Sequence, residues 1–288
     1  MEASNKSINL LMLFAMLTWG MAWSSAKIIN QFLGYDELVF LRFLVSLIIM
    51  IPFIFNKPIK LKFIEKDIII NMLIVSILFF LYNQCFFKGT DLGQAGKAGV
   101  FVTTTNPIIT FIIISIIEKK IHIFQTFAVF LGLIGGLFIL DIFNQEASNL
   151  LNSGTIYFIS CSIIWGIMTV LMSFKKNRIN PFWYITICYF LTSLISIFFI
   201  DVKSLSNFNY LDSIFLIHFS IVASAMSIGT SIYIYASSSL GAIKVSSFIF
   251  LVPFIAMSTA YLVMDEPMSW NIIIGGSLSM LSVYFINK

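Results

Sequence analysis

The sequence consists of long apolar runs of roughly 18–22 residues, separated by short polar breaks. A helix of about 20 apolar residues crosses the roughly 30 Å hydrocarbon core of a bilayer. Charged residues make up only 10% of the 288 residues, against about 25% in soluble domains. A soluble protein with so few charges could not cover its own surface. The chain is therefore predicted to be an all-α integral membrane protein, because helices satisfy their backbone polar groups internally.

The apolar runs predict ten transmembrane helices. The expected spans are Ile8–Ile29, Glu37–Phe55, Ile68–Phe87, Gly93–Ile117, Phe124–Phe143, Gly154–Phe174, Phe182–Ile200, Ile214–Ser237, Gly241–Met264 and Trp270–Ile286. None of them alternates polar and apolar residues as a barrel strand does. The polar start of the chain is not typical of a signal peptide, so we expect the first span to be retained.

Basic residues are distributed unevenly over the predicted loops. With the N-terminus in the cytoplasm, eleven of the seventeen basic residues lie in inside segments and Lys203 alone lies in an outside loop. This bias follows the positive-inside rule. It predicts a multi-pass protein of the inner (plasma) membrane with both termini in the cytoplasm.

Short motifs recur in the same order in the two halves of the chain. Trp19-Gly20 recurs as Trp165-Gly166 and Pro107 as Pro253, both at an offset of 146. Leu92-Gly93 recurs as Leu240-Gly241, and Glu118 as Glu266, at an offset of 148. Recurrence at nearly constant spacing indicates an internal duplication. We expect one repeat at residues 1–145 and a second at 146–288.

The parity of the spans predicts how the two repeats are related. Each repeat has five spans, so the second must enter the membrane in the opposite orientation. The loop residues agree, because Glu118-Lys119-Lys120 is basic whereas its counterpart Asp265-Glu266-Pro267 is not. Two inverted five-helix repeats are typical of carriers, whose substrate site lies near the bilayer midplane.

These motifs resemble the drug/metabolite transporter superfamily, specifically its EamA-type branch with ten helices. The resembling residues are Thr18-Trp19-Gly20, Leu41-Arg42-Phe43, Asn106-Pro107, Glu118, Trp165-Gly166, Val252-Pro253 and Asp265-Glu266. The resemblance covers essentially the whole chain. It implies a central cavity walled by spans one to four and six to nine, with spans five and ten at the periphery. Lys88, Lys97 and Lys244 depart from the general family pattern.

Three basic residues inside predicted spans are candidates for substrate contact. Arg42 lies about five residues into span two, where a guanidinium is costly unless it faces a cavity or reaches an interface. Lys97 and Lys244 occupy nearly equivalent positions, ten and nine residues before the two prolines. One interpretation is a gate or anion contact for Arg42, with the two lysines as vestibule charges that attract an anionic or zwitterionic substrate. Structural anchoring of Arg42 and snorkelling of the lysines are the others.

Aromatic residues inside the spans form a second group of candidates. Trp19 and Trp23 share one helix face because they are four residues apart, and Trp165 repeats the first of them. Aromatic walls suit organic substrates through stacking or cation–π contact; packing or contact with lipid is the alternative for any one of them. Other candidates that line or shape the site are Tyr82, Thr104, Tyr189 and Tyr233, with Pro107 and Pro253 as hinges.

Small residues in spans five and ten permit close helix packing. Gly132-x-x-x-Gly136 and Gly275-x-x-x-Ser279 are spaced one helical turn apart. They serve either packing within the monomer or a homodimer contact, and the sequence does not distinguish the two.

The residue types that are missing from the spans restrict the function. All thirteen acids fall at span ends or in loops, which favours facilitated diffusion or exchange over proton antiport. The sequence has no Ser/His/Asp set and no metal-ligand pattern, so we expect no enzyme activity, metal or cofactor. The leading hypothesis is a carrier or exporter of a small polar or amphipathic metabolite, amino acid-like or related, with lipid and substrate but no nucleic acid as partners. A membrane-embedded enzyme or a channel is the alternative.

Overall fold

The computed structural model describes residues 5–55, 65–93, 95–120, 123–139, 154–173, 179–264 and 269–287. These residues form helices and no strands. The helices are α1 (Asn5–Ile29), α2 (Tyr35–Phe55), α3 (Lys66–Leu92), α4 (Ala95–Glu118), α5 (Ile123–Ile139), α7 (Thr155–Ser173), α8 (Pro181–Ile197), α9 (Val202–Asn207), α10 (Ser213–Ser224), α11 (Thr230–Leu240), α12 (Ala242–Ser247), α13 (Val252–Met264) and α14 (Trp270–Asn287). The loops at 56–64 and 174–178 and the Asp265-Glu266 pair lie outside the described residues.

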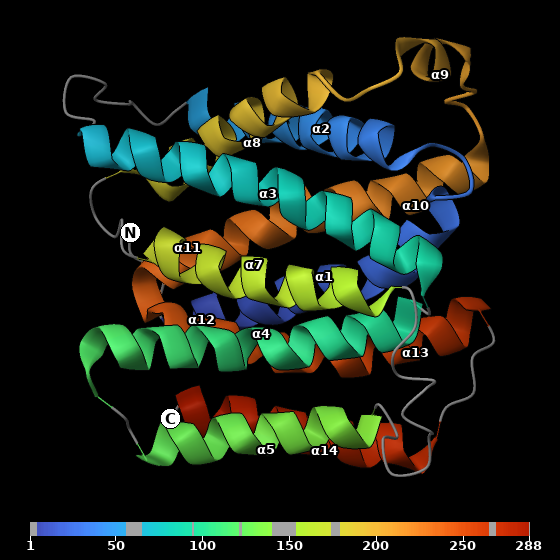
Figure 1. Ribbon diagram of the computed structural model, residues 1–288. Helices are drawn as coiled ribbons and strands as arrows, with labels where there is room; N and C mark the ends of the chain where they lie inside the picture. Colours follow the sequence, from blue (N-terminus) through green and yellow to red (C-terminus); the bar gives the residue numbers. More distant parts are fainter. Residues whose placement is uncertain are drawn as a thin grey trace.

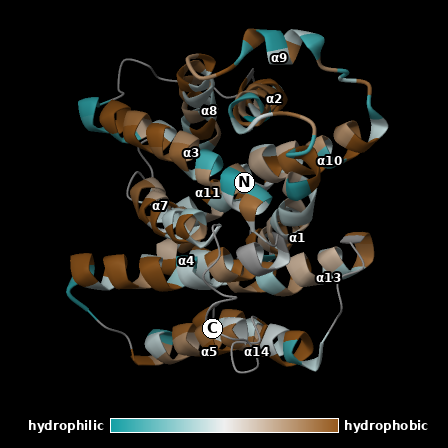
Figure 2. Ribbon diagram, turned by 45° about the vertical axis from the view of Figure 1, so that its right-hand side comes forward, coloured by the Kyte–Doolittle hydropathy of each residue, from teal (hydrophilic) through white to brown (hydrophobic). Residues whose placement is uncertain are grey.

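Apolar side chains cover the outward faces of the helices. Seven helical stretches are long and apolar enough to cross a membrane by length and composition, and α5, α8 and α14 are shorter apolar helices. Leu10 is 65% exposed and Ile116 69% exposed, and Figure 2 shows that hydrophobic residues predominate along the helices. A surface of this kind is stable in lipid and not in water. The expected all-α membrane class is thereby confirmed, whereas the number of spans stays a prediction.

The helices pack in pairs that join the two halves of the sequence. α1 contacts α10 and α13, α7 contacts α3 and α4, α2 contacts α8, and α5 contacts α14. In Figure 1 the α5–α14 pair lies at one edge of the molecule and the α2–α8 pair lies toward the other. One large hydrophobic core includes residues of both halves, so neither half has a separate core.

Two matching glycines bring helices of opposite halves close together. A Cβ atom on Gly20 of α1 would clash with Ile255 of α13, and a Cβ atom on Gly166 of α7 would clash with Ile109 of α4. Both the glycines and the isoleucines are 146 positions apart. Small residues allow helix backbones to approach in lipid, and here they do so at equivalent contacts.

The helices of the second half are less regular than their counterparts. A π-helical turn, Ala225–Gly229, separates α10 from α11, and a 3₁₀ segment, Phe248–Leu251, separates α12 from α13. The 3₁₀ segment ends two residues before Pro253, which cannot donate a helix hydrogen bond. α4 passes Pro107 as a continuous α-helix. Between α11 and α12 the chain turns at Gly241, whose φ of 86° favours glycine.

Candidate functional site

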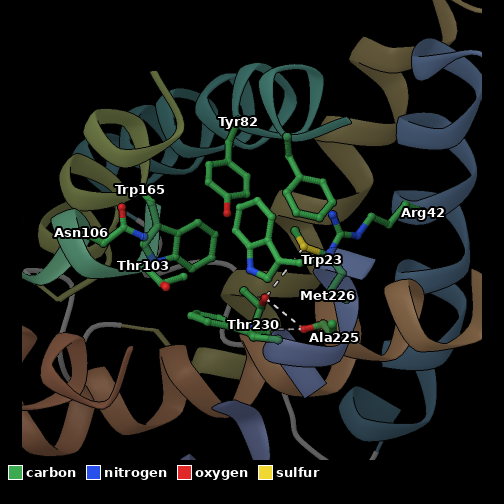
Figure 3. Close-up of a pocket in the computed structure, with 12 residues that line it drawn as sticks. Trp23, Arg42, Tyr82, Thr103, Asn106, Trp165, Ala225, Met226 and Thr230 are labelled. Carbon is green, nitrogen blue, oxygen red and sulfur yellow. Dashed lines mark hydrogen bonds between the residues drawn. The ribbon is translucent and has the colours of Figure 1, made fainter. Parts of the chain in front are cut away.

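A cavity lies in the middle of the helix bundle, among α1, α2, α3, α4, α7 and the π-helical turn with the start of α11 (Figure 3). Its lining residues are Trp19, Ala22, Trp23, Arg42, Tyr82, Phe86, Thr103, Asn106, Trp165, Ala225, Met226 and Thr230. The space open to the centres of water molecules is about 40 Å³, enough for about three waters. The cavity is therefore too small to hold an organic metabolite in this conformation.

Aromatic rings form much of the cavity wall. The Trp19 and Trp165 rings meet edge to face with centroids 5.0 Å apart, and the Tyr82 and Trp165 ring centroids are 4.9 Å apart. Trp23 meets Phe86 edge to face at 4.8 Å. Residues four apart share a helix face. For this reason α1 supplies both Trp19 and Trp23, and α3 supplies both Tyr82 and Phe86.

Arg42 supplies the positive charge of the cavity. Its side chain is 5% exposed, with Nε donating to the Val222 carbonyl oxygen at 3.2 Å and Nη1 donating to Asn83 Oδ1 at 2.6 Å. The guanidinium carbon lies 5.1 Å from the centre of the Phe86 ring. Asn83 is held in turn, because its Nδ2 donates to the Phe79 carbonyl oxygen at 2.8 Å. The cation is thus positioned by neutral groups.

One buried donor in the cavity wall has no hydrogen-bond partner among the described residues. The Trp165 indole nitrogen lies beside the Tyr233 hydroxyl but does not form a hydrogen bond. That hydroxyl instead lies 3.0 Å from Thr169 Oγ1. Figure 3 shows the Tyr82 hydroxyl pointing into the cavity. The Tyr82 hydroxyl is therefore placed to meet a ligand or water in the cavity, whereas the buried indole nitrogen of Trp165 faces Tyr233.

Polar side chains of α4 lie across the cavity from Arg42 (Figure 3). Thr103 donates to the Gly99 carbonyl oxygen at 2.5 Å. The Asn106 amide is assigned in the flipped orientation, because its nitrogen then donates to the carbonyl oxygens of Ser162 and Val102, each at 3.1 Å. In this orientation the amide oxygen of Asn106 is the atom that can accept a hydrogen bond.

The π-helical turn exposes backbone carbonyls that side chains of other helices bind. Trp19 Nε1 donates to the Ala225 carbonyl oxygen at 3.1 Å, and the Tyr189 hydroxyl donates to the Met226 carbonyl oxygen. Thr230 Oγ1 also contacts the Ala225 carbonyl oxygen, at 3.4 Å. Turns of this type occur frequently at functional sites. Here the turn fixes the orientation of two aromatic side chains.

The structure brings five of the predicted site residues together at the cavity: Trp19, Trp23, Arg42, Tyr82 and Trp165. Two others stand directly behind its wall. Tyr233 packs against Trp19 with ring centroids 5.0 Å apart, and Tyr189 supports the π-helical turn through its hydroxyl.

The other predicted residues lie elsewhere. Thr104 faces α5, where a Cβ atom on Gly136 would clash with it, so Thr103 rather than Thr104 lines the cavity. Lys244 lies within the short helix α12, is partly buried and does not line the cavity. The side chain of Lys97 lies outside the described residues. Neither Pro107 nor Pro253 lines the cavity.

Several lining residues were not predicted from the sequence. Asn106 was quoted only as part of a motif, although a polar residue next to a proline within an apolar span is a usable signal. Ala22 and Phe86 follow Trp19 and Tyr82 at helical spacing. No simple pattern in the sequence identifies Ala225, Met226 or Thr230, because their placement depends on the π-helical turn. In the part of the chain that the structure describes, no cluster of histidine, cysteine and acidic residues could hold a metal.

Comparisons with known proteins agree with this architecture. A chain of a solved crystal structure, 14% identical, aligns over 98% of both chains with a TM-score of 0.74, which shows a shared fold. A relative from Bacillus subtilis (strain 168), called "Uncharacterized transporter YoaV", is 23% identical over 278 residues, which are 93% of this chain and 92% of the relative. The model of the EamA-like transporter family matches residues 6–141 and again residues 152–288. The chain is therefore a multi-pass membrane protein that belongs to the EamA-like transporter family.

Proposed function

We propose that the chain is a secondary carrier or exporter that moves a small polar or amphipathic organic metabolite, amino acid-like or related, across the inner membrane by alternating access. The observation that carries the proposal is the central cavity. It is enclosed by helices of both halves and contains a buried cation with unused donors. A site at the interface of two structural repeats is typical of secondary transporters.

Equivalent contacts in the two halves support a pair of inverted repeats, at residues 1–145 and 146–288. The contact of Gly20 with Ile255 is repeated by that of Gly166 with Ile109, and both residue types are displaced by 146 positions. The pairs α1–α13 and α7–α4 correspond in the same way. A carrier of this kind works by moving one set of helices against the other around a fixed site.

The small size of the cavity supports a cycle with an occluded state. About 40 Å³ does not accommodate a metabolite, so the helices must separate for a substrate to enter. The π-helical turn and the 3₁₀ segment before Pro253 interrupt two helices. Such interruptions provide places where helices can bend, and we assign the hinge roles of Pro107 and Pro253 to this movement.

The distribution of basic loops predicts the topology of the carrier. In a variant without native cysteines, single cysteines placed at 56–66 or 175–178 should be protected from an impermeant thiol reagent in intact cells. A cysteine placed near Asn149 should react. Both results follow if the basic loops are cytoplasmic. Reaction of a cysteine at position 60 with the external reagent would contradict this orientation.

The carrier mechanism can be tested in proteoliposomes with three radiolabelled probes: phenylacetate, L-phenylalanine and phenethylamine. Saturable uptake of at least one probe, accelerated when the same unlabelled probe is inside, is expected for alternating access. Trp165→Ala should abolish this uptake, because the residue lines the cavity. Phe127→Ala should leave it unchanged, because Phe127 is 58% exposed on the outer surface. Uptake without saturation or acceleration would indicate a channel, and chemical conversion of the probe would indicate an enzyme. Either result would contradict the proposal, and so would a lack of uptake of all three probes.

A further inference from the structure

The cavity carries one formal charge, and it is positive. Arg42 is the only charged side chain among the residues that line the described cavity. Its two hydrogen-bond acceptors are a neutral amide and a backbone carbonyl, and no carboxylate of the described residues forms an ion pair with it. An uncompensated buried charge is strongly unfavourable. A ligand with a negative charge would therefore be stabilised at this position more than a neutral or positive one.

The unpaired polar atoms around the cavity match a carboxylate. A guanidinium has five N–H donors, and two of its nitrogens account for the two bonds of Arg42, which leaves three N–H groups unused. The Tyr82 hydroxyl faces the same space (Figure 3). A carboxylate accepts hydrogen bonds at both oxygens and binds the planar fork of arginine well.

The rest of the cavity suits a flat apolar group rather than a second charge. The faces and edges of Trp19, Trp23, Phe86 and Trp165 provide much of its wall. A zwitterion would bring an ammonium group, and no carboxylate lines the described cavity to pair with it. Binding of a zwitterion would leave the loaded cavity with a net positive charge, whereas a monoanion would leave it neutral.

Resting on the proposed carrier function, we infer that the substrate is an organic monoanion: a carboxylate joined to a planar apolar body. The carboxylate binds to the unused N–H groups of Arg42, and the apolar body packs between the aromatic rings. Asn83 and Val222 position the guanidinium from behind. This assignment narrows the substrate class and favours an anion over an amino acid.

The assignment is tested by binding of isosteric probes to the purified wild-type protein. Phenylacetate and phenylacetamide have nearly the same shape, but only the first is an anion at neutral pH. Phenylacetate should bind about tenfold more tightly than the amide, as expected for a charge-assisted pair. L-Phenylalanine and phenethylamine should bind no better than the amide. Equal or tighter binding of the amide, the zwitterion or the amine would overturn the assignment.

Variants connect the preference to Arg42. Arg42→Gln should reduce the ratio of the two affinities to about one, and Arg42→Lys should keep part of it, since lysine retains the charge but not the planar fork. Lys203→Gln, which changes an exposed charge outside the site, should alter neither affinity. The comparison of probes on the wild-type protein stands even if an Arg42 variant does not fold.

The two proposals fail in different ways. If phenylacetate binds preferentially but shows no trans-accelerated uptake in proteoliposomes, the substrate class is supported and the carrier function is contradicted. If phenethylamine or L-phenylalanine is carried while phenylacetate neither binds nor moves, the carrier function is supported and the monoanion is overturned.

Discussion

An aspartate in place of Asn83 is expected to remove phenylacetate binding almost completely. Asn83 is fully buried and accepts a hydrogen bond from Arg42 Nη1 at 2.6 Å. Aspartate has nearly the same shape and would place a permanent negative charge beside the guanidinium. The cavity would then be neutral before a ligand enters. We expect the affinity for phenylacetate to fall about a hundredfold, because the new carboxylate both neutralises Arg42 and repels the anion, and close buried charge pairs couple by about 1.5–7 kcal/mol.

The neutral probe and a second asparagine provide the controls for this substitution. Phenylacetamide should bind Asn83→Asp about as well as it binds the wild-type protein, which shows that the cavity is intact. Asn71 lies on the same helix, is also buried, and accepts a hydrogen bond from the Tyr184 hydroxyl. It lies twelve residues from Asn83, about 18 Å along the helix. Asn71→Asp should change phenylacetate affinity less than about twofold, because the substitution lies far from the cavity.

Isothermal titration of the purified variants measures both affinities directly. If folded Asn83→Asp protein binds phenylacetate as tightly as the wild-type protein does, the free charge of Arg42 is not what binds the anion. An equal loss of affinity for both probes would show that the cavity is damaged rather than neutralised. That result would also count against the assignment of Arg42 as the anion site.

The sequence predicted the aromatic part of the site better than its polar part. Trp19 and Trp23 are four residues apart, and Trp165 repeats Trp19 in the second half. Helical periodicity and the internal repeat are properties of the sequence itself, so these residues could be placed on one wall. The structure places all three at the cavity.

The polar part depends on contacts between helices, which periodicity does not provide. Thr103 and Thr104 are neighbours on α4, and a rotation of about 100° separates them. Packing of Thr104 against Gly136 decides which of them faces the cavity. In the same way, the sequence identified Arg42 as a costly cation but could not identify Asn83 on another helix as its partner. The proposed substrate class depends on the fact that neutral groups position the Arg42 cation.

The π-helical turn could not be predicted for a different reason. Its segment, Ala225–Gly229, lies within an apolar stretch that reads as a continuous helix. The turn is compensated by side chains that are distant in sequence, because Trp19 and Tyr189 bind its carbonyl oxygens. Such a defect is stable only when these partners are in place.

Close contact between α5 and α14 leads to the second large effect, which concerns stability rather than binding. A Cβ atom on Gly275 would clash with the backbone oxygen of Gly135. Neither backbone can move away without separating the helices, which are held by close packing rather than by exclusion of water. We expect Gly275→Ala to lower the free energy of unfolding by about 3 kcal/mol, the upper part of the range for overpacked interiors. The small-residue faces of both helices are thus used within the monomer.

Gly132 provides the matched comparison, because a Cβ atom there would meet only the ring of Phe250, at 2.6 Å. Gly132→Ala should be less destabilising when Phe250→Ala is also present, with a coupling of about 0.5–3 kcal/mol between the two changes. Gly275→Ala should gain no such relief from Ile139→Ala, since the backbone oxygen of Gly135 remains. Thermal unfolding in detergent measures the four single variants and the two double variants. Phenylacetate affinity should be unchanged in the folded fraction, because α5 and α14 do not line the cavity. Rescue of Gly275→Ala by Ile139→Ala would show that a side chain, and not the backbone, sets the distance between these two helices.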